Sequence, residues 1–346
     1  MYKKYLWISH SAINTFDRCP QAYYYQYQYK NPETGNRIQV VNPYFSLGLS
    51  VHRVIEDLSP LSIEERLNLS LKDRFEKIWS EYSGKKGGFV SDKQEEEFKK
   101  RGEMMIERVV NSDFLEKPST EIEDEVPSID LIPEEDIKLV GSLDWIRVMD
   151  DGGLHIIDFK TGKNKESKKS LQLPIYNILA NKKLDGDVEK FSYWYLNSDD
   201  KLTPRELGSM DESLEVIKEK ALEIKDHVEN NDYPCHYNGK CFACGDYHKI
   251  FNGQADYLGV NDSGKDLYFV LDADDIVRKL IDNQVFEMKE EKVFELRMDG
   301  KSLSNIEKEL RMKESKLEDI TLSIKKKMVK ELTPREVKLL VDKKLR

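Results

Sequence analysis

The strongest constraint on the fold is a pair of short β-branched and aromatic runs on either side of the turn sequence DDGG at residues 150–153. These runs are IKLVGSLDWIRVM before the turn and GLHIIDFK after it. Asp-Gly between two such runs is typical of a β-hairpin. The second run ends on Asp158, Phe159 and Lys160 and then enters the loop TGKNK. Because Asp158 and Lys160 are two residues apart on a strand, their carboxylate and ammonium groups project from the same face.

This hairpin can assemble a metal site. Asp144 is expected on the first strand, so its carboxylate can approach that of Asp158. Hard divalent cations such as Mg²⁺ and Mn²⁺ take a few oxygen ligands, and the two carboxylates with the backbone carbonyl of Phe159 would supply them. Lys160 would then orient or deprotonate a water, or stabilise charge during phosphodiester hydrolysis. An Asp-x-Lys pair alone is more often a surface ion pair than part of a catalytic site. The surrounding motifs are therefore needed to distinguish the two.

The segments around the hairpin have helical or strand patterns. Helical spacing is found at 46–58, in a charged region extending to Val110, at 170–182 and at 213–230, and a further strand is expected at 191–196. Helices that alternate with a hairpin and a strand in this order predict an α/β fold with a mixed sheet flanked by helices.

Four of these segments resemble the motifs of one nuclease family. GSLDWIRV followed by LHIIDFKTGK resembles the PD-(D/E)XK nuclease core in its RecB-family form. Upstream, GLSVHRVIE resembles the histidine motif of that family, and downstream QLPIY resembles its Q-x-x-x-Y motif. The motifs occur in the family's order and cover roughly His52 to Tyr176. The resemblance implies a restriction-endonuclease-like core.

The resemblance also implies roles for individual residues. His52, Asp144 and Asp158 would bind the metal ion, and Lys160 would act on the attacking water. Gln172 and Tyr176 would support the site or contact DNA, although residues four apart are neighbours on any helix. Glu56 follows His52 by one helical turn and would help to position it.

Three of the four cysteines form a cluster late in the chain. Cys235, Cys241 and Cys244 have the spacing C-x5-C-x2-C, and Cys19 lies far upstream in FDRCPQAYY. Disulfides are not expected in a cytoplasmic chain, and the spacing is that of a metal site. Four thiolates bind either zinc or a 4Fe-4S cluster, and the spacing leaves both open.

The family resemblance implies the iron-sulfur cluster. RecB-family nucleases of the AddB and CRISPR-associated type carry one cysteine in an N-terminal Cys-Pro motif and three after the nuclease core. Cys19 and the late triplet fit this arrangement. The usual triplet is C-x2-C-x5-C, whereas here the longer gap comes first and Ile250 stands where the last cysteine would fall. Cys235 would replace that ligand from the other side.

Charge is distributed unevenly along the chain. The net charge is −10, yet residues 301–346 hold 14 Lys and Arg against 8 Asp and Glu, an excess of +6. Residues 259–266 have linker composition, and the chain after them is expected to be helical with a break at MDGKSLS. We therefore expect a nuclease domain over 1–258, a linker over 259–266 and a helical domain over 267–346. The last is consistent with a helix-turn-helix that binds DNA, or with a helical hairpin that contacts a protein.

These features predict a Mg²⁺- or Mn²⁺-dependent deoxyribonuclease. The resemblance alone favours an exonuclease that acts on the ends of linear DNA in recombination or repair. No phosphate-binding loop of the type G-x-x-x-x-G-K-[ST] occurs, so a helicase or recombination protein would have to unwind the DNA. Without a signal peptide or a long apolar run, we expect no membrane contact and a cytoplasmic location, in a bacterium or in the host of a phage. The alternative is a non-catalytic DNA-binding scaffold with a structural zinc site.

Overall fold

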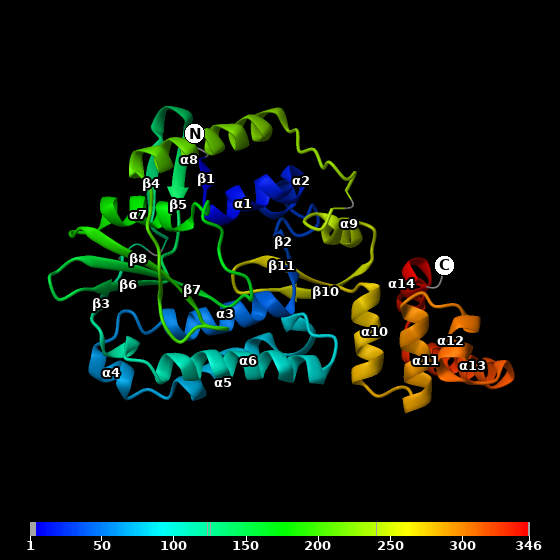
Figure 1. The fold of residues 1–346 in the computed structure, drawn as a ribbon. Coiled ribbons are helices and arrows are strands. Elements are labelled where there is room, and N and C mark those ends of the chain that lie inside the picture. Colours follow the sequence, from blue (N-terminus) through cyan, green and yellow to red (C-terminus); the bar gives the residue numbers. More distant parts are fainter. Residues whose placement is uncertain (1–4, 123, 125, 240, 345–346) are drawn as a thin grey trace.

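The computed structural model describes residues 5–122, 124, 126–239 and 241–344, and a mixed five-stranded sheet lies at the centre of its α/β body (Figure 1). The strands, in spatial order, are β3 (Ser119–Thr120), β6 (Trp145–Val148), β7 (Leu154–Lys160), β8 (Val188–Tyr195) and β9 (Thr203–Pro204). β7 and β8 are parallel, and the other neighbours are antiparallel. The predicted α/β fold with a mixed sheet is confirmed.

The hairpin of β6 and β7 has the predicted turn but a shorter first strand. Trp145 pairs with Ile157, and Gly152 has a φ of +87°, which glycine adopts without strain. The sequence predicted Asp144 on the first strand, but it lies just before β6. Its Oδ2 accepts the Phe159 N–H at 2.8 Å, so a side chain takes the place of the backbone acceptor that a longer strand would supply.

Helices pack on both faces of this sheet (Figure 1). Those of one face are α3 (Pro43–Glu56), α5 (Leu71–Trp79) and α6 (Asp92–Val110), and those of the other are α1 (His10–Arg18), α7 (Gln172–Lys183) and α8 (Met210–Asn230). Side chains alternate along β7, so Ile157 packs with α3 whereas Ile156 packs with α7. Asp158 and Lys160 share the face of Ile156. Side chains from α3, the hairpin and α7 can therefore meet where β7 ends.

Two smaller sheets complete the α/β body. One has the order β1 (Leu6–Ile8), β5 (Ile137–Val140) and β4 (Ser128–Ile132), and the other β10 (Ala255–Val260), β11 (Lys265–Val270) and β2 (Arg37–Val41). Residues 259–266, expected to be a linker, contain the turn of the β10–β11 hairpin, and β11 pairs in parallel with β2. The remaining short helices of the body are α2 (Pro20–Tyr23), the π-helix Tyr24–Gln28, α4 (Ile63–Leu67), α9 (Gly245–Phe251), and four 3₁₀ turns at Ser80–Tyr82, Gly84–Gly87, Phe114–Glu116 and Pro133–Glu135.

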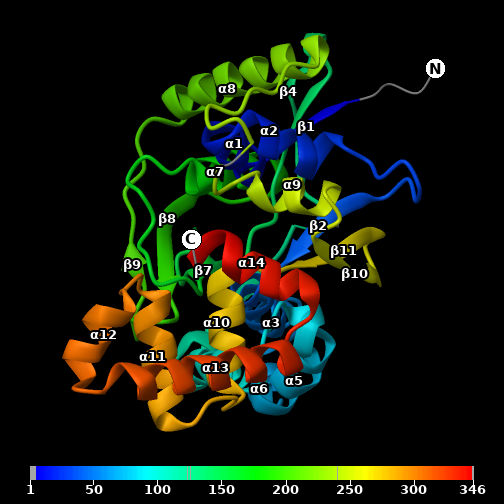
Figure 2. The same cartoon turned by 90° about the vertical axis from the view of Figure 1, so that its right-hand side faces the viewer.

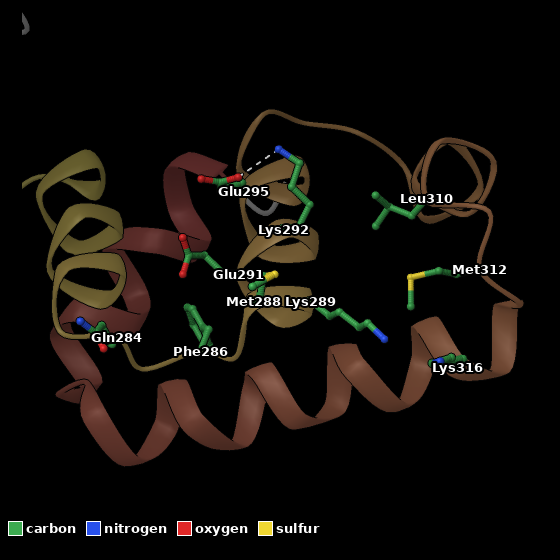
Figure 3. A pocket seen from close by; sticks show the side chains of 10 residues that line it. All are labelled: Gln284, Phe286, Met288, Lys289, Glu291, Lys292, Glu295, Leu310, Met312 and Lys316. Atoms are coloured by element: carbon green, nitrogen blue, oxygen red, sulfur yellow. Dashed lines mark hydrogen bonds and ion pairs between the residues drawn. The ribbon is translucent and has the colours of Figure 1, made fainter.

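The C-terminal helices form a bundle beside the α/β body (Figures 1 and 2). They are α10 (Ala273–Asp282), α11 (Met288–Met298), α12 (Leu303–Leu310), α13 (Glu314–Glu331) and α14 (Pro334–Lys344). The bundle has its own hydrophobic core. A cavity of about 820 Å³ opens between α11, α12 and α13, with Phe286 and Met312 among its apolar residues (Figure 3). We propose that the second domain begins at α10, because β11 belongs to a sheet of the body.

Charged contacts join the bundle to the body. Asp282 at the end of α10 accepts a hydrogen bond from Ser91 at 2.6 Å and lies 3.3 Å from the Lys93 ammonium. Within the bundle, the ammonium group of Lys327 on α13 lies 2.6 Å from the Glu290 carboxylate of α11. A DNA-binding role for the bundle stays a prediction. None of the described helices has the length and apolar character needed to cross a membrane.

Candidate active site

Helix α3 contributes His52 and Glu56 to the candidate site. Asn42 caps the N-terminus of this helix, because its side chain accepts the Phe45 N–H. The first residue of the helix is Pro43. His52 and Glu56 are one turn apart, and His52 Nδ1 lies 2.8 Å from Glu56 Oε1 and 3.4 Å from Asp144 Oδ2. One ligand atom from each of the three residues falls within 4.8 Å of the other two. The structure thus brings His52 and Asp144 together, as predicted, but the third residue of this group is Glu56 and not Asp158.

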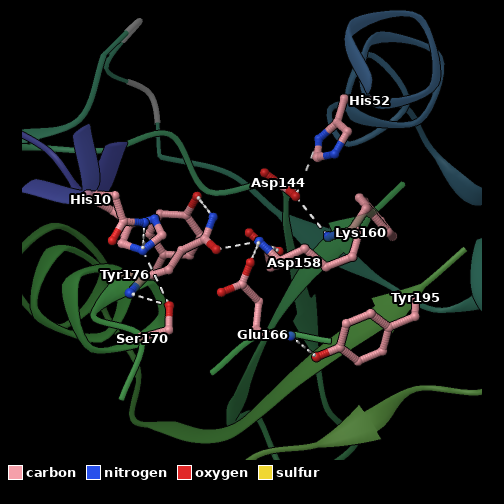
Figure 4. A network of polar contacts seen from close by, with 12 residues as sticks. His10, His52, Asp144, Asp158, Lys160, Glu166, Ser170, Tyr176 and Tyr195 are labelled. Atoms are coloured by element: carbon pink, nitrogen blue, oxygen red, sulfur yellow. Dashed lines mark hydrogen bonds and ion pairs between the residues drawn. The ribbon is translucent and has the colours of Figure 1, made fainter. Parts of the chain in front are cut away.

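Asp158 and Lys160 form the other half of the site (Figure 4). Asp158 is fully buried, and its Oδ2 lies 2.8 Å from Lys160 Nζ. The Lys160 ammonium also donates to Gln172 Oε1 and lies 3.5 Å from Glu166. Gln172 in turn donates to the Tyr176 hydroxyl at 3.1 Å. Gln172 therefore contacts the catalytic lysine candidate directly, and Tyr176 is linked to it through Gln172.

Negative charge accumulates at this site. Burial, and then the charge of Asp158, raise the pKa of Asp144 well above its usual value. Burial raises the pKa of Asp158 as well, although Lys160 acts against this. Burial lowers the pKa of His52, but Asp144 and Glu56 outweigh it and raise that pKa to about 9. The pocket therefore attracts positive charge, whether a proton or a metal ion.

The donors present fit a divalent cation. Asp158 Oδ1 is buried and has no hydrogen-bond partner in the part of the chain that the structure describes. Such an oxygen needs an explanation, and carboxylates with one imidazole form a suitable donor set for Mg²⁺ or Mn²⁺. The Phe159 ring is buried near His52, with 6.1 Å between ring centroids. The role of the Phe159 carbonyl as a ligand stays a prediction.

Glu166 was missed by the sequence analysis, although a local signal exists. It is the one acid in the lysine-rich loop 161–169. Its N–H donates to the Tyr195 hydroxyl at 3.0 Å, which ties the loop to β8. The side chain can therefore reach Lys160. His10 was missed too: it lies 3.3 Å from Ser170, and burial, with a contribution from Lys160, lowers its pKa to about 4.

The four cysteines come together at a second centre. Their sulfur atoms all lie within 4.8 Å of one another, and none forms a disulfide. Cys241 and Cys244 are 3.1 Å apart, and Cys244 and Cys235 are 3.6 Å apart. This group joins Cys19, between α1 and α2, to the segment that follows α8. The ligand set predicted from the sequence is thus assembled in space.

The surroundings of the thiols act on them in opposite directions. Burial raises the pKa of Cys19 to about 11. Burial acts in the same direction on Cys235, but the backbone N–H groups near Tyr237 and Gly239 outweigh it and lower that pKa to about 6. Gly239 has a φ of +78°, and a Cβ there would lie 2.6 Å from a ring nitrogen of His248. The loop that carries Cys235 therefore needs glycine at this position.

The mixed sheet, its flanking helices and the acidic group beside β7 define a restriction-endonuclease-like protein. The family model of the PD-(D/E)XK nuclease superfamily matches residues 7–247, which is more than half of the chain and includes all four cysteines. The chain therefore belongs to the PD-(D/E)XK nuclease superfamily. Membership implies a metal-dependent nuclease that uses Mg²⁺ or Mn²⁺ and acts on DNA. A comparison with curated proteins gave no match.

Proposed function

We propose that the protein is a deoxyribonuclease that degrades linear DNA from its ends with Mg²⁺ or Mn²⁺ bound beside β7. The observation that supports this most is the fully buried Asp158, whose Oδ1 has no hydrogen-bond partner among the described residues and whose Oδ2 lies 2.8 Å from the Lys160 ammonium. A vestigial site has no need to keep an unsatisfied buried carboxylate, because such a group destabilises the fold.

Each residue of the site has a role in this proposal. His52, Asp144 and Asp158 hold the cation, and Glu56 is a further ligand or orients the His52 ring. The cation would supply an activated water and neutralise charge on the phosphate. Burial lowers the pKa of Lys160, but Asp158 outweighs it and raises that pKa, so the side chain is held as an ammonium. Lys160 then stabilises negative charge and orients the water rather than removing its proton.

The second pair of motif residues positions that ammonium. The Gln172 carbonyl accepts a hydrogen bond from Lys160, and its amide group donates to Tyr176. The Tyr176 hydroxyl is held by this bond deep in the protein, and burial raises the pKa of Tyr176 well above its usual value. The tyrosine therefore stays neutral and acts as a fixed acceptor for Gln172.

End dependence is tested with two forms of one DNA. Purified protein with Mn²⁺ or Mg²⁺ is expected to release nucleotides from an end-labelled linear fragment and to leave the covalently closed circle of the same sequence intact. Chelation of the metal should stop the reaction. Equal cleavage of the circle would remove the exonuclease assignment but keep the nuclease. Cleavage of neither form would favour the non-catalytic scaffold.

Asp144→Asn is expected to separate metal binding from stability. In metal-free protein the variant should melt higher than wild type by roughly 1–2 °C, or about 1 kcal/mol, because it removes one of two buried carboxylates that repel each other. Asparagine can still accept the Phe159 N–H. Addition of Mn²⁺ should raise the melting temperature of wild type but not of the variant. Asp130→Asn, at an exposed residue of β4, is the matched control. If Mn²⁺ raised the melting temperature of Asp144→Asn as much as that of wild type, the assignment of Asp144 as a ligand would be contradicted.

We also propose that Cys19, Cys235, Cys241 and Cys244 hold a 4Fe-4S cluster that ties the first helices to the end of the nuclease core. The family-type arrangement of the cysteines supports the cluster. A single zinc ion is the second candidate, because bonds of about 2.3 Å in a tetrahedron bring four sulfurs as close together as they are here. Anaerobically purified protein should contain iron and acid-labile sulfide and absorb visible light. Stoichiometric zinc without iron would refute the 4Fe-4S assignment and favour a zinc site.

The cellular role follows from the chemistry. We propose that a helicase or recombination protein acts together with this chain in the cytoplasm and supplies the unwinding for which this sequence has no phosphate-binding loop. The basic part of the C-terminal bundle, residues 301–346, is our candidate for contact with that partner or with the DNA backbone.

A further inference from the structure

A hollow of about 440 Å³ runs along the exposed face of α3. Its walls are largely apolar and come from Tyr44, Phe45 and Leu49 of the helix and from Tyr82, and its floor is Gly48. Tyr44 and Phe45 are 62% and 40% exposed. Two neighbouring aromatic side chains with this much exposed surface do not belong to the hydrophobic core. They form an apolar surface that can bind a ligand.

The hollow is continuous with the candidate metal site. His52 and Glu56 line its other end, and they are the same side chains that face Asp144. Tyr44, Gly48, His52 and Glu56 are four residues apart and therefore form one row along the helix. Eight residues separate Tyr44 from His52, about 12 Å at 1.5 Å per residue. A ligand in the hollow would lie within about four nucleotides of the scissile phosphate, even at the 3.4 Å spacing of duplex DNA.

The chemistry of the walls favours a base over a phosphate. Arg53, the lining residue with a permanent positive charge, already lies 2.5 Å from Glu81. Tyr44 is held in place by an edge contact with Phe98 and by the Arg101 guanidinium, 6.0 Å from its ring centroid. Aromatic side chains kept in position in this way stack on nucleobases of any sequence.

Gly48 supports a close approach of the ligand. Glycine inside a helix is less stable than alanine by about 1 kcal/mol. Among the described residues, a Cβ at this position would meet only Thr161 Oγ1, at an ordinary contact distance of 3.5 Å, so packing does not require glycine. Its effect is to keep the floor of the hollow flat.

We propose that this hollow binds an unpaired nucleobase within a few nucleotides of the phosphate that is cleaved, so that the substrate is single-stranded DNA or a frayed DNA end. Bases inside a duplex stack on one another and cannot enter such a hollow. The inference rests on the proposed nuclease function, and it specifies the form of the DNA that the site accepts.

The test compares a single-stranded oligonucleotide with an abasic strand of the same length, which has the same phosphates but no bases. Binding is measured by fluorescence anisotropy in the presence of a chelator, so that no cleavage occurs. Wild type should bind the normal strand at least about fivefold more tightly than the abasic strand. The double substitution Tyr44→Ala with Phe45→Ala should abolish this preference and raise KM for single-stranded DNA.

Three further proteins sharpen the result. Gly48→Leu, which fills the floor, should also abolish the preference, whereas Gly48→Ala should keep most of it. Tyr257→Ala, which removes a half-exposed tyrosine of β10, should leave it unchanged. If wild type cleaves DNA but the preference survives both Tyr44→Ala with Phe45→Ala and Gly48→Leu, the base subsite is refuted while the nuclease stands. If wild type neither binds nor cleaves any DNA, the proposed function fails first.

Discussion

Lys160→Gln is expected to lower metal-dependent DNA cleavage by about 10²- to 10³-fold, which is the usual loss when one preorganised electrostatic stabiliser is removed. Glutamine can still donate a hydrogen bond to Asp158 and reach Gln172, but it carries no charge. The substitution thus removes the ammonium while it keeps most of the local packing.

The measurement is the rate of nucleotide release from single-stranded linear DNA in Mn²⁺, together with a melting curve to show that the variant is folded. Lys163→Gln, at an exposed residue of the loop that follows β7, is the matched control and should retain wild-type activity within a few-fold. A Lys160→Gln protein that is folded and as active as wild type would show that the buried Asp158–Lys160 pair is structural.

Cys244→Ser is expected to have the largest effect on stability. Cys244 is fully buried, and its sulfur lies within 3.6 Å of those of Cys241 and Cys235. Structural metal sites contribute many kilocalories per mole to folding, so the loss of one ligand should cost several kcal/mol, well above the roughly 1 kcal/mol of an average substitution. Loss of the metal should also destabilise the packing of the α1–α2 segment, because that segment carries Cys19.

The check combines metal analysis with thermal unfolding. Cys244→Ser should lose most of its bound metal and melt well below wild type, whereas Phe242→Ser, a fully exposed side chain in the same loop, should change neither quantity. Normal metal content together with an unchanged melting temperature in Cys244→Ser would show that the four thiols pack together without a metal centre.

Local sequence patterns predicted the elements whose signal lies within the segment itself. The DDGG turn located the hairpin, and the two-residue spacing of Asp158 and Lys160 placed both on one face, where the structure has them 2.8 Å apart. The predicted start of β6 was wrong. The apolar neighbours of Asp144 predicted that it lies on the strand, but its carboxylate accepts the Phe159 N–H and replaces the regular backbone pairing there.

Long-range pairing decided the features that local patterns missed. Residues 261–264 have a composition shared by linkers and hairpin turns, and the parallel pairing of β11 with β2, more than 200 residues away in the chain, makes them a turn. Glu166 gave only a weak signal, since its approach to Lys160 depends on how the loop is tied to Tyr195. Glu56 was expected to position His52, and its approach to Asp144 depends on where α3 packs against the hairpin.

The most direct test of the site is the position of Mn²⁺ in a crystal of the wild-type protein, located by its anomalous scattering. The ion should lie within bonding distance of carboxylate oxygens from both Asp144 and Asp158 and of the His52 ring, with the Lys160 ammonium at its edge. An ion bound elsewhere, or an Asp158 carboxylate that stays unliganded at saturating Mn²⁺, would contradict the account.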